Sequence, residues 1–229
     1  MSFAALSLVV LASFVHATWN LLAKRAAPAG PSFVFAYNLF CCLAYAPWVV
    51  WLLAQGAVSW NLPGTACILL SGVVHLAYSL CLQRGYQVAD LSVVYPVARG
   101  TGPMLSSVGA FILLGEVPTL RGVIGLAAVV IGIGLVSTQG NLSAFRRPEG
   151  HAGVRWGTAT GGLIATYTVV DAFAVKGFGV QPVILDWCSN LLRFVLLLPF
   201  VARNRALARE RMQGRWLLAV AVGLLSPLS

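Results

Sequence analysis

Long apolar runs, separated by short polar or glycine- and proline-containing segments, cover most of the chain. A helix rises about 1.5 Å per residue, so about 20 apolar residues cross a hydrocarbon layer about 30 Å thick. The runs that reach or approach this length are residues 3–23, 33–53, 64–82, 91–114, 120–137, 157–175, 183–201 and 216 to the end. The pattern predicts an all-α polytopic membrane protein with about seven and a half transmembrane helices.

Composition agrees with a membrane location, since 59% of the residues are hydrophobic and only 9% are charged. The Lys and Arg residues that give the net charge of +9 lie mostly between the apolar runs, where membrane topology explains them. The expected partner is therefore the lipid bilayer and not nucleic acid. The five cysteines fall inside apolar runs without a CxxC pair, and His16, His75 and His151 lack metal-ligand spacing. We therefore expect no disulfide framework, no metal site and no cofactor.

The run at residues 91–116 is unusual because polar and helix-perturbing residues lie in its middle. They are Tyr95, Pro96, Arg99, Gly100, Gly102 and Pro103. A helix that starts near Leu91 places Arg99 about 12 Å along the span, close to the middle of the bilayer. A charge at this depth must face the helix bundle or a wet cavity, and broken helix is tolerated only there. The stretch predicts either part of a substrate cavity or a proline-kinked helix whose Arg99 is paired with a neighbour.

A weak internal repeat appears when the chain is shifted by 151 positions, which places Pro31 on Pro182, His16 on Tyr167 and Asn20 on Asp171. Two repeats of five helices, an odd number, insert with opposite orientation and typically enclose a transport site at their interface. The expected division is a first repeat at 1–138, a linker at 139–156 and a second, incomplete repeat at 157–229. On this basis we expect the native protein to have about 290 residues.

Four polar residues inside the spans are candidates for a binding site. His16 and Asn20 are one helical turn apart and would either line a cavity or make polar contacts between helices. Asp171 would hold a cationic group, carry a coupling proton, or pair with Arg99 or Arg193. Arg193 lies near the middle of its span, and Asp186 is too far along the same face for an ordinary contact with it.

Aromatic and small residues complete the candidates. Tyr78, Tyr95 and Tyr167 would stack against a solute or donate hydrogen bonds to it, although span aromatics also serve packing. Small residues recur through the span at 120–137, which makes it a close-packing helix suited to a scaffold role or to a homodimer.

The motifs resemble those of EamA-type members of the drug/metabolite transporter superfamily. The similar segments are HATWNLLAKRA at 16–26, VVYPVARGTGP at 93–103, LLGE at 113–116, the glycine-rich fifth span and YTVVDAFAVKG at 167–177. The resemblance implies ten helices in two inverted repeats, a central cavity, alternating access and a bacterial inner-membrane location. It also implies cytoplasmic termini, whereas the distribution of Lys and Arg places the N-terminus outside, so orientation stays open.

The expected function is a secondary transporter, either an exporter or a permease, that moves a small metabolite. The lack of a GxxxxGK[ST] motif argues against ATP hydrolysis, and the sequence shows no constellation typical of an intramembrane enzyme. Arg99 would bind or gate near an anionic group, and Asp171 would meet an amine or a proton. Two arginines against one carboxylate deep in the spans favour an anionic or zwitterionic solute. The alternative is a scaffold without transport activity or an inactive truncated fragment.

Overall fold

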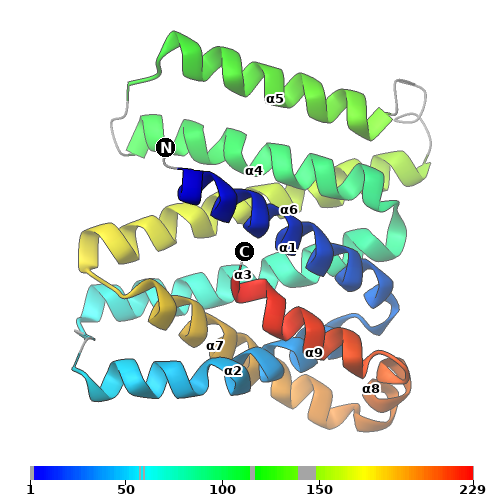
Figure 1. Ribbon diagram of the computed structural model, residues 1–229. Helices are drawn as coiled ribbons and strands as arrows, with labels where there is room; N and C mark the ends of the chain where they lie inside the picture. The colour runs from blue at the N-terminus through cyan, green and yellow to red at the C-terminus, as the bar shows by residue number, and fades with distance from the viewer. Residues whose placement is uncertain (1–2, 57, 59, 114–116, 139–147, 229) are drawn as a thin grey trace. The chain divides into compact units, whose positions relative to one another are not determined.

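The computed structural model describes residues 3–56, 58, 60–113, 117–138 and 148–228, and this part of the chain is helical (Figure 1). The elements are α1 (Phe3–Arg25), η1 (Ala27–Ala29), α2 (Pro31–Ala54), α3 (Leu62–Val88), α4 (Leu91–Leu113), α5 (Leu120–Thr138), α6 (Pro148–Ala172), the π-helix η3 (Phe173–Gly177), α7 (Pro182–Arg203), α8 (Arg205–Met212), α9 (Trp216–Leu225) and η4 (Ser226–Leu228). The expected all-α membrane fold is confirmed.

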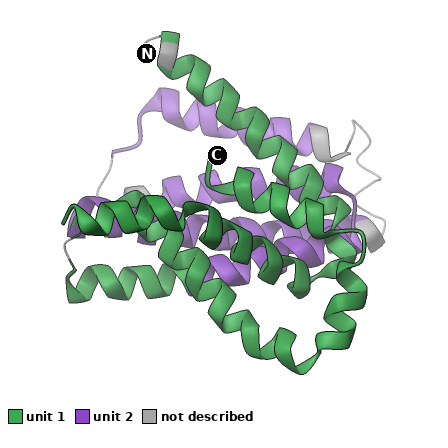
Figure 2. Cartoon of the chain, turned by 60° about the horizontal axis from the view of Figure 1, so that its bottom comes forward, with its two compact units in different colours: residues 1–72, 179–229 green, residues 73–178 purple. Residues whose placement is uncertain are grey.

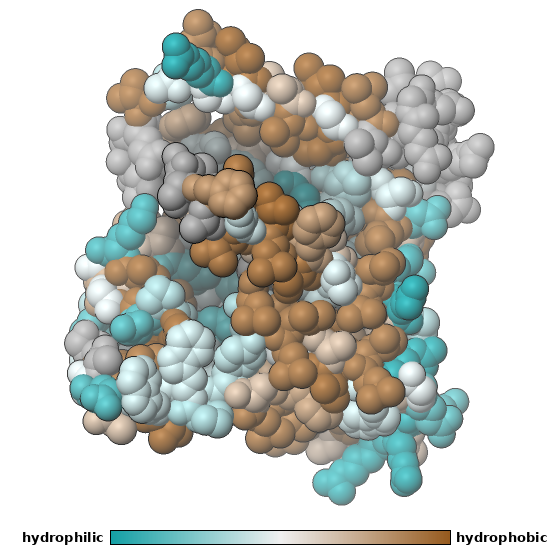
Figure 3. All heavy atoms as spheres, viewed as in Figure 1, coloured by the Kyte–Doolittle hydropathy of each residue, from teal (hydrophilic) through white to brown (hydrophobic). Residues whose placement is uncertain are grey.

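Among the described helices, five are long and apolar enough to cross a membrane, namely α1, α2, α3, α6 with η3, and α7. The helices α5 and α9 are shorter apolar helices. Large apolar side chains are exposed on them, such as Leu217, which is 83% exposed. Figure 3 shows apolar residues spread over α1 and α9, whereas hydrophilic residues gather at α8. Such a surface is suited to contact with lipid.

The chain divides into two compact units, drawn in different colours in Figure 2. Unit 1 comprises residues 1–72 and 179–229, and in it α2 packs against α7 and α9. The contact between α2 and α9 is close, since a Cβ atom on Gly223 would lie 2.7 Å from the carbonyl oxygen of Tyr37. The hydroxyl of Tyr45 donates a hydrogen bond to the carbonyl of Leu224 at 2.9 Å.

Unit 2 comprises residues 73–178, and in it α4 packs along α6 and against α5. The contact between α4 and α6 depends on glycines at every fourth position of α6. A Cβ atom would lie 2.9 Å from Val93 if it were added to Gly153, 2.9 Å from Val97 if added to Gly157, and 2.6 Å from Thr101 if added to Gly161. The missing side chains let the two backbones approach closely.

Helix boundaries differ from the expected spans in two places. The helix α3 continues to Val88 through residues expected in a loop, and α6 begins at Pro148, inside the expected linker. Residues 139–147 of that linker, like Glu116 of the LLGE segment, lie outside the described residues. Hydropathy marks the lipid-facing length, whereas helices extend beyond the hydrocarbon layer. The two inverted repeats and their boundaries stay predictions.

The helix α4 is continuous from Leu91 to Leu113, and Pro96 and Pro103 lie inside it. The basic stretch between α7 and α9 contains a short helix, α8. The small residues of α5 do not all pack within unit 2, because a Cβ atom on Gly125, Gly132 or Gly134 would meet nothing within 4 Å. A homodimer through α5 stays a prediction.

Candidate functional site

Arg99 lies in the middle of α4 and is half-buried in unit 2. Tyr95 precedes it by four residues and therefore lies on the same helix face. The guanidinium carbon of Arg99 is 5.6 Å from the centre of the Tyr95 ring, which is the geometry of a cation–π contact. The guanidinium also lies close enough to Tyr78, Tyr167 and Tyr86 to interact with them electrostatically.

The helix α3 brings three polar aromatic residues to this site. His75, Tyr78 and Tyr86 follow one another at intervals of three and eight residues, which keeps them near one face of the helix. Tyr78 and Tyr86 are buried, and Tyr86 lies in the part of α3 that hydropathy had assigned to a loop. An aromatic face of this kind supplies stacking surface together with hydroxyl groups.

The helix α6 adds Tyr167 and Asp171, which are one turn apart. The ring of Tyr167 stacks on His75 with centroids 3.9 Å apart, and Tyr78 meets Tyr167 edge-on at 5.6 Å. The Nε2 atom of His75 is 4.0 Å from Oδ2 of Asp171. We call this set the tyrosine–arginine cluster, and it consists of His75, Tyr78, Tyr86, Tyr95, Arg99, Tyr167 and Asp171.

The cluster combines a permanent cation with a carboxylate and several aromatic rings. The guanidinium of Arg99 keeps its charge under all physiological conditions and is suited to oxyanions. The side chains of His75 and Asp171 are 18% and 27% exposed, so neither is sealed from its surroundings. The arrangement can hold an oxyanion at Arg99 and an aromatic ring against the tyrosines.

Five residues expected from the sequence therefore meet in one unit: Tyr78, Tyr95, Arg99, Tyr167 and Asp171. Their assignment to substrate binding stays a prediction. His75 and Tyr86 were missed, because His75 had been considered only as a metal ligand. Its position three residues before Tyr78 was the available signal.

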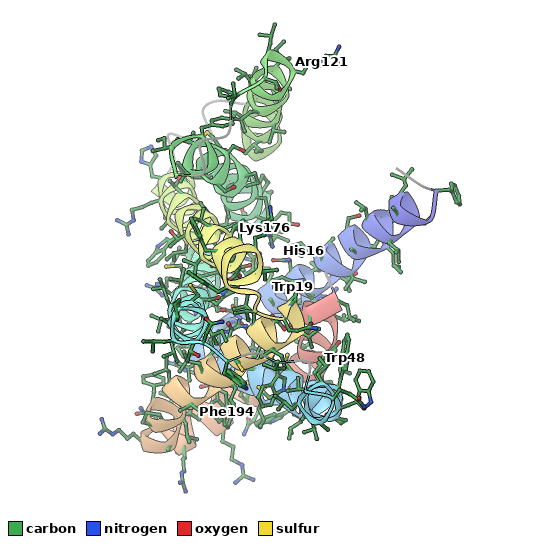
Figure 4. All side chains as sticks on the ribbon, turned by 90° about the vertical axis from the view of Figure 1, so that its left-hand side faces the viewer. His16, Trp19, Trp48, Arg121, Lys176 and Phe194 are labelled. Atoms are coloured by element: carbon green, nitrogen blue, oxygen red, sulfur yellow. The ribbon has the colours of Figure 1, made fainter. Side chains whose placement is uncertain are left out.

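The other expected residues lie in unit 1. On α1, the rings of His16 and Trp19 are 5.0 Å apart and nearly perpendicular, and Figure 4 labels both on this helix. The buried Asn20 donates a hydrogen bond from its side-chain amide to the carbonyl of His16 at 2.8 Å. One amide proton of Asn20 is thus used by α1 itself.

Arg193 belongs to a chain of polar side chains along α7. Its guanidinium donates to Oδ1 of Asn190 at 2.7 Å, and the Asn190 amide donates to Oδ2 of Asp186 at 3.1 Å. Arg193 is only 6% exposed. The sequence had indicated that Asp186 and Arg193 are too far apart for direct contact, and Asn190 bridges them. This geometry favours a structural role for Arg193.

A hollow on the surface of unit 2 is lined by Val97, His151, Val154 and Arg155. None of its lining residues belongs to the tyrosine–arginine cluster. The proposed binding site is therefore the cluster, with its cation and aromatic rings, and not this hollow.

Residues 3–138 match the EamA-like transporter family. Two curated relatives are similar to part of the chain: the multidrug resistance protein EbrB of Bacillus subtilis (strain 168) and that of Bacillus atrophaeus. Each is 33% identical over 75 residues, which is 33% of this chain and 59% of the relative. The match thus spans little more than half the length of these relatives. No solved structure matches the chain.

Proposed function

This chain belongs to the EamA-like transporter family, and from that premise we propose that it moves a small organic solute through a membrane by secondary transport. The tyrosine–arginine cluster is the proposed binding site. The observation that carries the proposal is a guanidinium in the middle of α4, faced by tyrosine rings from three helices. Ionisable residues inside membrane helices usually mark the pathway of a substrate or an ion.

The proposed solute is an organic anion or zwitterion with an aromatic or other planar part. Arg99 attracts the oxyanion, and the faces of Tyr95 and Tyr167 supply stacking surface. Asp171 lies in the same cluster and would receive an amine where the solute has one. The name of the two relatives, multidrug resistance protein, supports an organic solute.

Transport would follow alternating access in the plasma membrane, with solute moved outward or inward. The prolines of α4 support this proposal, because each removes one backbone hydrogen bond from the helix. Such positions absorb a change in helix geometry at low cost. His16 and Asn20 on α1 remain proposed parts of the substrate path.

The test is a thermal-shift series with three probes that share a phenylethyl group and differ in charge. They are 2-phenylethanesulfonate, phenylalanine and phenethylamine, added to the purified protein in detergent. A ligand present at about 100 times its dissociation constant stabilises the folded state by about 2.7 kcal/mol. We expect the first two probes to raise the melting temperature and phenethylamine to leave it unchanged.

Two variants locate the effect. Arg99→Gln removes the cluster cation and should abolish the shift, whereas Arg84→Gln removes an exposed arginine of α3 in the same unit and should preserve it. If phenethylamine alone raised the melting temperature, the preferred solute would be a cation and not an anion. The absence of a shift with every probe would favour a scaffold without transport activity.

A further inference from the structure

We propose that His75 and Asp171 bind and release a proton during transport, so that the coupled ion is a proton. The inference rests on the proposed function, because coupling exists only in a protein that moves a solute. It assigns a role to His75, which the sequence did not single out, and gives Asp171 a role in addition to contact with a solute amine.

The geometry places the two groups in a dyad between helices. His75 comes from α3 and Asp171 from α6, with 4.0 Å between Nε2 and Oδ2. The imidazole is held by stacking on Tyr167 at 3.9 Å and by the edge of Tyr78 at 6.5 Å. Histidine is the side chain that ordinarily changes charge near neutral pH. Together with the neighbouring carboxylate, the imidazole forms a site that can bind and release one proton.

The charged and titratable groups of unit 2 around the dyad come from each packed element. They are Tyr78 and Tyr86 on α3, Tyr95 and Arg99 on α4 and Tyr167 on α6. Lys176, which follows Asp171 along the chain, is exposed on η3. Arg99 is the permanent cation of the cluster. With His75 neutral, Arg99 and Asp171 have opposite charges that cancel. With His75 protonated, the three groups have a net charge of +1.

This balance couples the proton to an anionic solute. A proton on His75 compensates the negative charge of Asp171, so an anionic solute that enters the cluster meets less repulsion from this carboxylate. Each ligand therefore favours the binding of the other, as linkage requires. The imidazole accepts a proton from water and returns it to water on the other side, and no other bond forms or breaks.

The backbone beside Asp171 is also unusual. The α-helix α6 ends at Ala172, and a π-helix follows at Phe173–Gly177. Single π-helical turns occur frequently at functional sites, because they change which residues face a neighbouring helix. Asp171 thus lies at the point where the helical geometry of α6 changes.

The first test uses proteoliposomes and radiolabelled 2-phenylethanesulfonate, whose charge is constant at every pH used. Two rates are measured: exchange of solute at equal pH, and accumulation in vesicles whose interior is more alkaline than the medium. One proton per solute allows up to about tenfold accumulation for each pH unit. We expect His75→Gln to retain exchange and lose the accumulation, and the exposed control His151→Gln to retain both.

The second test needs no solute. Histidine-labelled protein in detergent is followed by NMR from pH 5.5 to 8, and the signal of His75 is identified by its loss in His75→Gln. We expect the His75 signal to titrate in this range with a midpoint that Asp171→Asn changes.

The outcomes separate the two proposals. A His75 signal that does not titrate, or one that ignores Asp171→Asn, overturns the dyad, as does His75→Gln with undiminished gradient-driven accumulation. A wild-type protein that exchanges none of the phenylethyl probes contradicts the proposed function, and the NMR titration then still decides whether the dyad exists.

Discussion

Substitution of Gly161 by alanine tests the contact that holds α4 against α6. The added methyl group would lie 2.6 Å from Cβ of Thr101, 3.0 Å from the carbonyl oxygen of Ala98 and 3.0 Å from the backbone nitrogen of Gly102. Two of these atoms belong to the backbone and cannot rotate away. The helices must therefore move apart, and overpacking of this kind costs about 1–3 kcal/mol.

Gly162 provides the matched control, because a Cβ atom there would meet nothing within 4 Å. Both substitutions gain the helix propensity of alanine over glycine, which is about 1 kcal/mol. We expect Gly162→Ala to be neutral or stabilising and Gly161→Ala to be destabilising. The difference between the two variants cancels the propensity gain and equals the packing cost, about 1–3 kcal/mol.

The assay is reversible unfolding in mixed micelles with increasing SDS, monitored by far-UV circular dichroism. Equal midpoints for the two variants would refute the close contact at Gly161. A loss of stability in Gly162→Ala would do the same, since it would show that the two faces of α6 had been assigned wrongly.

Two further predictions concern unit 1. Arg193→Met should lower the free energy of unfolding by about 1–3 kcal/mol because it leaves Oδ1 of the buried Asn190 without its hydrogen bond from the guanidinium, whereas the double variant N190L/R193M, which removes both partners, should lose less than the sum of the two single variants. Unfolding of the single and double variants measures this coupling, and additive losses would contradict the bridge through Asn190. Gly223→Val should lower the free energy of unfolding by about 1–3 kcal/mol, because the added atoms meet backbone of α2. An unchanged melting temperature would show that α2 and α9 are not in close contact.

Hydropathy predicted the helices well because a membrane span requires a minimum apolar length. It failed at Gln83–Val88 and at 148–156, where helix continues through polar residues. The prolines Pro96 and Pro103 lie inside a continuous helix, in agreement with the single span expected at 91–114. A proline removes one hydrogen bond, and packing against neighbouring helices compensates that loss.

The site was only partly predictable. Arg99 and Asp171 are conspicuous because charges are rare inside membrane spans. Nothing in the sequence around His75 indicates a site, because its contacts are with Tyr167 and Asp171, which lie far along the chain. Small residues were also only a partial guide. The sequence predicted close packing for those of α5, whereas glycines in close contact, such as Gly157, lie on α6. Composition identifies a face that can pack closely but not its partner.

The spacing of the contacts between α4 and α6 also bears on how the site would move. Gly153 faces Val93, Gly157 faces Val97 and Gly161 faces Thr101, so the two helices run in the same direction with a constant offset. Contacts repeated over several turns, with backbone against backbone, favour movement of α4 and α6 together. Arg99 and Asp171 would then keep their separation during transport.

His75 is carried by α3, so its contact with Asp171 joins α3 to the α4–α6 pair. A displacement between these two parts breaks the dyad while leaving the Arg99–Tyr95 contact within α4 intact. The proton would therefore be released when α3 moves, and the solute would remain bound to Arg99 until its own path opens. This order predicts that a cross-link between α3 and α6 stops gradient-driven transport but still permits solute binding, which the thermal shift of the cross-linked protein would measure.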